Sequence, residues 1–207
     1  MGTVSQLHER LRPPAHSIQS EEEALDIARS LAAGFALQAS DRDINRVLPY
    51  DEIEALSQSG LLGISVPSEH GGIDISNSVL TEVVAILAEA DPSIAQIPQT
   101  HFHVLEAVRI GGSEEQKASL FARAIIGDRF GGVFTKIGVG TAGQDALQVT
   151  LDGLGHRLNG RSFDSPSVLF SDWIAIFAAT DDNGAFVAVI PRNTEGIQII
   201  DDWDGFG

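Results

Sequence analysis

Five of the 21 glycines lie in one run, residues 130–145, which contains a G-x-G-x-x-G at 138–143. Closely spaced glycines let backbone N–H groups converge on an anion, because the missing Cβ permits positive φ and close approach. A dinucleotide-binding βαβ unit also needs a following helix and an acidic residue about 20 positions on. Asp164 sits near that spacing, but the turn dipeptide Asp152-Gly153 follows too soon for a crossover of about a dozen residues. We therefore interpret the run as a glycine-rich loop between antiparallel strands.

Two histidines offer acid–base or metal chemistry. His101 and His103 are two residues apart on an expected helix, about 200° around its axis, so they cannot bind one metal ion together. His101 shares its face with apolar residues such as Leu105, whereas His103 shares its face with Glu106. A histidine on an apolar face is most often a hydrogen-bonded core residue, and His103 is expected to be solvated.

The acidic clusters are interpreted structurally. Glu21, Glu22 and Glu23 stand in the first turn of a helix, where carboxylates favour the helix dipole. The aspartates near residues 201–204 surround a tryptophan in an expected turn, and we predict no metal site there.

Bulk composition indicates a globular chain of 207 residues, with 43% hydrophobic residues and no cysteine. The net charge of −16 argues against nucleic-acid binding, which favours a basic surface. Neither an apolar signal core nor a membrane-spanning run is found. We expect a cytoplasmic protein with no nucleic-acid or membrane partner.

The pattern changes from helical to β near residue 128. Five helices are expected: one from Ser20, one from 51 to Gly60, one from 78 to 90, one from 92 to Gly111 and one from 113 to Gly127. Short apolar runs separated by turn signals then predict strands at 130–135, 146–151, 156–163, 173–179, 185–191 and 197–200. We predict an α+β chain: a tail at 1–19, a helical bundle at 20–127 and an antiparallel β-barrel or sandwich at 128–207.

Six segments in this order resemble the acyl-CoA dehydrogenase superfamily: PSEHGG, LAEADPSIA, GSEEQK, FTKIGVGT, LNGRSF and SDWIAIFA. The similarity covers about residues 20–207. Within the superfamily, IAQIPQTHF, LFSDWIAIFA and IDDWDGFG are most similar to the flavin-dependent oxidoreductases of sulfur acquisition and desulfurisation.

The resemblance implies a flavin, FMN or FAD, held by the β domain. The implied cofactor-binding residues are Phe134, Thr135, Lys136, Gly138, Gly140, Thr141, Phe163 and Ser165. Thr135 matches the threonine of the T-E-P-G-A-G-S motif that binds the flavin ring. Phe163 stands where a tryptophan covers one flavin face, and Ser165 where a threonine bonds near the reactive edge. His101 is the implied catalytic residue, because related monooxygenases place a histidine of this helix near the flavin.

Two departures from the family pattern bear on the site. Lys136-Ile137 replaces Glu-Pro, which puts a cation either on a flavin phosphate or simply at the surface. Asp164 and Pro166 interrupt a segment that usually carries small neutral residues.

The resemblance also implies that a C-terminal helical bundle, with the catalytic base and most of a homo-oligomeric (tetrameric) interface, is absent, so this chain alone is expected to be inactive. The expected activity is monooxygenation of a small organosulfur compound with reduced flavin from a separate reductase. One alternative is an FAD-dependent acyl-CoA dehydrogenase, and another is a non-catalytic fragment that packs against a partner chain.

Overall fold

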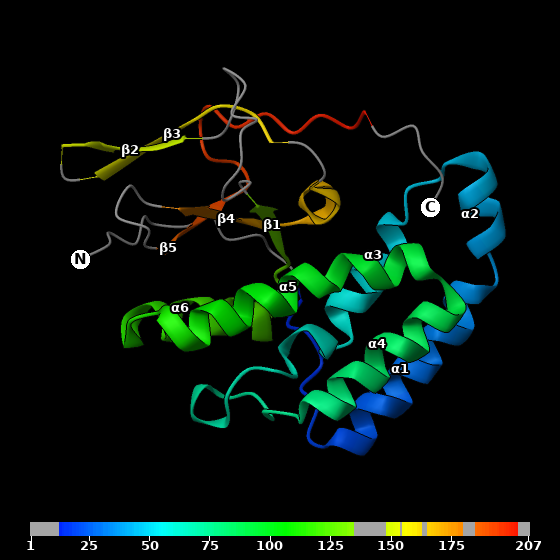
Figure 1. Ribbon diagram of the computed structural model, residues 1–207. Helices are drawn as coiled ribbons and strands as arrows, with labels where there is room; N and C mark the ends of the chain where they lie inside the picture. Colours follow the sequence, from blue (N-terminus) through cyan, green and yellow to red (C-terminus); the bar gives the residue numbers. More distant parts are fainter. Residues whose placement is uncertain (1–12, 135–147, 154, 163–164, 180–184, 203–207) are drawn as a thin grey trace.

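The computed structural model describes residues 13–134, 148–153, 155–162, 165–179 and 185–202. Within these residues a helical part comes first and a small β part follows, which confirms the predicted α+β class (Figure 1). The helices are α1 (Glu21–Ala36), α2 (Ala39–Asn45), α3 (Tyr50–Gln58), α4 (Asn77–Ala90), α5 (Pro92–Gly111) and α6 (Glu114–Ile125), with 3₁₀ turns η1 (Leu61–Gly63) and η2 (Ser68–His70). No helix in these ranges is long and apolar enough to cross a membrane.

Side-chain caps start α1 and α6 where the sequence predicts. Ser20 Oγ accepts the Glu23 N–H at 3.1 Å at the start of α1. The Glu23 carboxylate accepts the N–H of Gln19 rather than that of Ser20, so the reciprocal bond that a Ser-x-x-Glu spacing favours is shifted by one residue. At α6 the full capping box forms between Ser113 and Gln116. Each bond satisfies a backbone group that a helix end leaves without a partner.

Helix α5 belongs to two hydrophobic cores. Pro98 lies inside it, where the absent N–H interrupts the helical hydrogen bonds. Before Pro98, the buried Ile94 and Ala95 pack into the core built on α1, α3 and α4. After it, a second core joins α5 to α6 and the β part; its buried residues include Val104, Leu105, Val108, Phe121, Phe130 and Trp173. Helix α5, which carries both histidines, is therefore packed into the helical core before Pro98 and into the core shared with the β part after it.

Helix α2 was not predicted from the sequence, because this short helix has no apolar stripe and its Ile44 is 76% exposed. A buried cation holds it instead. The Arg42 guanidinium donates to Asp91 Oδ2 at 2.7 Å, to Glu52 Oε1 at 2.6 Å and to the Phe35 carbonyl at 2.6 Å. One side chain thus ties α2 to the end of α1, to α3 and to the N-terminus of α5.

The β part has a three-stranded sheet and a separate hairpin. Its elements are β1 (Phe130–Phe134), β2 (Gln148–Asp152), β3 (Gly155–Asn159), the 3₁₀ turn η3 (Pro166–Phe170), β4 (Trp173–Ala179) and β5 (Ala185–Pro191). The sheet order is β1-β4-β5, and β2 pairs antiparallel with β3. Strand β4 pairs antiparallel with β5 but parallel with β1, in a register that sets Phe134 opposite Phe177.

The parallel β1–β4 pair corrects the prediction of an all-antiparallel domain. The strands that flank the glycine run, β1 and β2, lie in different sheets rather than forming one antiparallel pair. Turn signals identify strand ends but not partners, and the β1–β4 connection is long enough for a parallel crossover. The described strands form no closed barrel.

Residues 197–200 are not a strand, and this prediction was wrong. Ile197 and Ile199 pack against the sheet residues Ile174 and Ile176, while Ile200 is 60% exposed. The apolar run that predicted a strand is buried on one side only, which a segment can be without forming ladder hydrogen bonds.

Replacing Arg42 by methionine is expected to destabilise the protein by about 3–5 kcal/mol, because the buried carboxylates of Asp91 and Glu52 lose their counterion. The measurement is urea unfolding followed by far-UV circular dichroism. Arg29→Met is the control, since Arg29 pairs with Asp26 at the surface and should cost less than about 1 kcal/mol. Equal losses for the two variants would contradict a structural role for the buried pairs.

Candidate functional site

Strand β1 runs through a narrow space between η3 and α5, and two glycines make this possible. A Cβ built on Gly131 would lie 2.9 Å from the Val168 Cα, and one on Gly132 would lie 2.4 Å from the Thr100 Cγ2. Both distances are too short for any other residue without movement of the neighbours. Two of the five glycines of the run therefore serve close packing of the backbone, which places the end of β1 beside α5.

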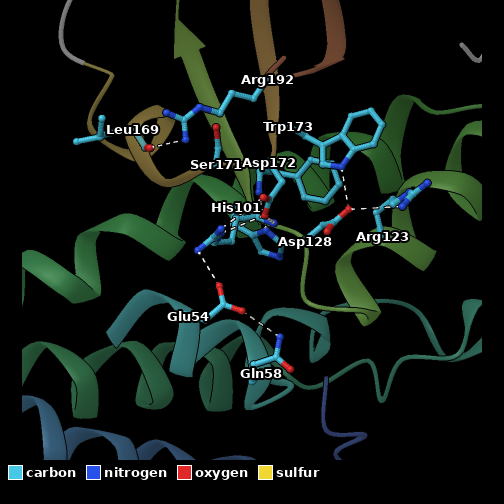
Figure 2. A network of polar contacts seen from close by, with 12 residues as sticks. Glu54, Gln58, His101, Arg123, Asp128, Leu169, Ser171, Asp172, Trp173 and Arg192 are labelled. Atoms are coloured by element: carbon cyan, nitrogen blue, oxygen red, sulfur yellow. Dashed lines mark hydrogen bonds and ion pairs between the residues drawn. The ribbon is translucent and has the colours of Figure 1, made fainter. Parts of the chain in front are cut away.

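A polar network joins the start of β1 to the helices (Figure 2). Arg129 Nε donates to Asp172 Oδ2 at 3.1 Å, and Arg129 also pairs with Glu54 of α3 at 3.6 Å. Trp173 Nε1 donates to Asp128 Oδ2 at 3.0 Å. Because these charged groups are mostly buried and paired, they set the position of β1 and β4 on the helical part.

An aromatic cluster of His103, Phe134 and Phe177 lies where β1 ends. The rings of Phe134 and Phe177 stack at 4.8 Å between centroids and 11° between planes. The His103 ring meets them at 5.5 Å and 5.2 Å. Phe134 is 51% exposed, and the cluster directly precedes Thr135. The cluster offers a half-exposed aromatic surface on which a planar ring can stack.

The sequence predicted a solvated His103 and indicated no contact between this residue and the two phenylalanines, so the cluster was not predicted. His103 is indeed exposed, but its ring contacts both phenylalanines. The grouping depends on the parallel register of β1 on β4 and on the crossing of α5 over β1. Neither the register nor the crossing can be predicted from local sequence patterns.

The turn η3 brings Ser165 to the same strand. Ser167 Oγ accepts the Gly132 N–H at 3.3 Å, which anchors η3 on β1. Ser165 directly precedes η3, and its Oγ is buried without a hydrogen-bond partner among the described residues. A buried hydroxyl without a partner costs free energy, so its position fits a ligand that supplies a hydrogen bond.

His101 lies in the interior instead. Its side chain is 2% exposed, its Nε2 donates to the Leu62 carbonyl at 2.8 Å, and its Nδ1 accepts the Phe130 N–H at 3.2 Å. Desolvation by burial lowers its pKa from 6.5 to about 4, although the Leu62 hydrogen bond and the charge of Asp172 act in the opposite direction. Both ring nitrogens are engaged by backbone, as expected of a core histidine. Its predicted catalytic role stays untested.

The remaining predicted cofactor-binding residues are Thr135, Lys136, Gly138, Gly140, Thr141 and Phe163, and they lie outside the described residues. Their contacts with a flavin stay predictions. Of the described residues that border them in the sequence, Phe134 ends β1 and Ser165 directly precedes η3, and β1 and η3 pack on each other. Among the described residues no cluster of metal-ligating side chains is present.

Residues 19–128, just over half of the chain, match the family model described as acyl-CoA dehydrogenase, N-terminal domain. The chain belongs to the acyl-CoA dehydrogenase family. This agrees with the six motifs, of which the first three fall inside the matched range.

Within the acyl-CoA dehydrogenase family, the chain is similar to monooxygenases. It is 31% identical to the probable FMNH2-dependent monooxygenase SfnC of Pseudomonas putida, over 89% of this chain and 46% of the relative. It is 27% identical to the dibenzothiophene monooxygenase of Mycolicibacterium goodii, over 88% and 46%. The crystal structure of FMN-bound TdsC from Paenibacillus sp. A11-2 superposes with a TM-score of 0.77 at 29% identity, over 87% and 47%. The chain thus spans about half the length of these relatives.

Replacing Gly132 by alanine is expected to destabilise the protein by about 1–3 kcal/mol, because the new methyl overlaps Thr100 and crowds the Phe134 ring. Combining it with Thr100→Ser removes the overlapping Cγ2 and should recover a large part of the loss in thermal or urea unfolding. Gly34→Ala is the control, since a Cβ there meets nothing within 4 Å. Failure of Thr100→Ser to compensate would show that this contact does not limit position 132.

The burial of His101 predicts a pH dependence of stability. Because its pKa is lower in the folded state than in the unfolded chain, its contribution is complete above about pH 6.5 and is lost as the pH falls towards 4. Between pH 7.5 and 5 the expected loss is about 2 kcal/mol in urea unfolding. His101→Phe should remove this part of the pH dependence, whereas His103→Phe should retain it. An unchanged slope in His101→Phe would refute the assignment.

Proposed function

We propose that the chain forms the N-terminal and middle domains of a reduced-flavin monooxygenase that acts on a small organosulfur compound. In this proposal residues 20–127 form the helical domain and 128–207 the β domain. The relatives named for FMNH2-dependent and dibenzothiophene monooxygenase activity support this function, since both align with about nine-tenths of the chain. A separate flavin reductase would supply the reduced flavin.

The observation that carries the proposal is the unsatisfied Ser165 hydroxyl, which directly precedes η3, the turn that packs on the strand ending at Phe134. A flavin is planar, aromatic and edged with hydrogen-bonding groups. It fits a site that combines a partly exposed phenylalanine with a buried hydroxyl. Thr135, Gly138, Gly140 and Thr141 follow Phe134 directly and would bind the ring and its ribityl or phosphate groups.

When bound, a reduced flavin supplies the two electrons of the monooxygenation, in which one atom of O2 is added to the substrate sulfur and the other is reduced to water. The chain's own residues would bind and orient the flavin. Phe134 would cover part of the ring, and Ser165 would hydrogen-bond its edge. The stacked Phe177 holds the Phe134 ring in place through their 4.8 Å contact.

The test is an anaerobic titration with reduced FMN, beside oxidised FMN and FAD, followed by flavin fluorescence and thermal shift. It is made on this chain and on a chimera in which the C-terminal half of the Pseudomonas putida relative follows residue 207. We expect reduced FMN to bind best. Ser165→Ala should weaken binding by about 3- to 10-fold through loss of one hydrogen bond, whereas the surface control Ser30→Ala should not.

Preferential, tight retention of FAD would support an acyl-CoA dehydrogenase instead. Absence of any flavin response from both folded proteins would contradict the proposal and favour a non-catalytic fragment. Equal affinities of the Ser165→Ala and Ser30→Ala variants would show that Ser165 does not contact the flavin. Binding of the flavin by the chain would not be contradicted.

A further inference from the structure

On the outer edge of β1, side chains accept the backbone N–H groups that a further strand would pair with in a larger sheet. The strand pairs with β4 on one side only in the described sheet. On the other side the N–H groups of Phe130 and Gly132, two residues apart, point outward as the period of a strand requires. His101 Nδ1 accepts the first at 3.2 Å, and Ser167 Oγ accepts the second at 3.3 Å.

The hydrogen bonds also define the state of the imidazole. Nδ1 accepts the Phe130 N–H, so it carries no proton, and Nε2 carries the proton that it donates to the Leu62 carbonyl. The ring therefore connects three elements: η1 through Leu62, α5 through its own backbone, and β1 through Phe130. Protonation or removal of the ring would break at least the bond to β1.

Among the described residues, the space next to His101 is too small for a ligand of flavin size. The void beside the ring is about 10 Å³ and is lined mostly by apolar side chains, among them Ile97, Pro98 and Phe170. A single water needs roughly 10–15 Å³, and ligand pockets have about 300–1,000 Å³. An effect of His101 on a ligand at the end of β1 is therefore indirect.

The hydrogen bond at Phe130, the first residue of β1, bears on the position of Phe134, the last residue of this strand. Phe130 and Phe134 are the two ends of a five-residue strand. Between them, Gly131 and Gly132 touch η3 and α5 so closely that the strand has little lateral freedom. A shift of Phe130 along the strand would therefore move Phe134.

We propose that His101, together with Ser167, is a positioning residue that holds the outer edge of β1 and thereby sets the place of Phe134, the aromatic residue of the proposed flavin site. The proposal rests on the proposed flavin site for its functional part only. The hydrogen bonds to β1 are testable without any ligand.

The first measurement is amide hydrogen exchange by NMR on the 207-residue protein. In His101→Phe, a ring of similar shape without an acceptor, exchange at Phe130 should become about 10-fold faster, as loss of one hydrogen bond predicts. In His101→Asn, whose Oδ1 can replace Nδ1 as acceptor, most of the protection should return. His103→Phe, an exposed change on the same helix, is the matched control and should leave Phe130 exchange unchanged.

The second measurement is the affinity for reduced FMN at a temperature where circular dichroism shows each variant folded. His101→Phe should weaken binding by about 10-fold and His101→Asn by much less. Should His101→Phe not fold, Ser167→Ala provides the same test through Gly132, with faster exchange there and weaker flavin binding.

Unchanged Phe130 exchange in His101→Phe would overturn the positioning role, whatever flavin does. Faster exchange with unchanged flavin affinity would overturn the link between β1 and the site. If the wild-type protein binds no flavin while the exchange results hold, the proposed function fails and the role of His101 in holding β1 stands.

Discussion

The contact between α5 and the glycine pair of β1 is the constraint on which the described site depends. Gly132 lets the Thr100 side chain approach where any Cβ would overlap it, and Gly131 does the same for η3 on the opposite face. Because β1 is packed from both faces, its end at Phe134 has a defined place beside His103. A looser strand would leave the aromatic cluster without fixed geometry.

Buried polar groups where the sheet meets the helices also fix the position of the sheet. Arg129 pairs with Asp172 and Trp173 donates to Asp128 where the sheet meets the helices. Buried charges are costly when unpaired, so alternative placements of the sheet that separate these partners are strongly disfavoured. Arg42 has a similar role at the other end of α5, where it holds Asp91, the residue that also caps this helix.

Two histidines on one helix illustrate how packing separates residues of the same type. His101 bonds backbone groups through both ring nitrogens and is buried, whereas His103 is exposed and its ring contacts those of Phe134 and Phe177 at the end of β1. The sequence-based preference for His101 as the catalytic residue came from a family resemblance, while its apolar helix face had indicated a core position. The structure agrees with the indication from the helix face.

Local interactions made the helices predictable from the sequence. Ser113, Gln116 and the Asp91-Pro92 pair mark helix starts through bonds to residues three positions away, so the chain itself specifies them. The six family motifs likewise identified the acyl-CoA dehydrogenase family. What only the tertiary structure decided was the parallel β1–β4 pairing, the helix α2 held by a buried arginine, and the meeting of His103, Phe134 and Phe177. These depend on contacts between residues far apart in the chain, and hydrophobic periodicity records which face is buried but not which element buries it.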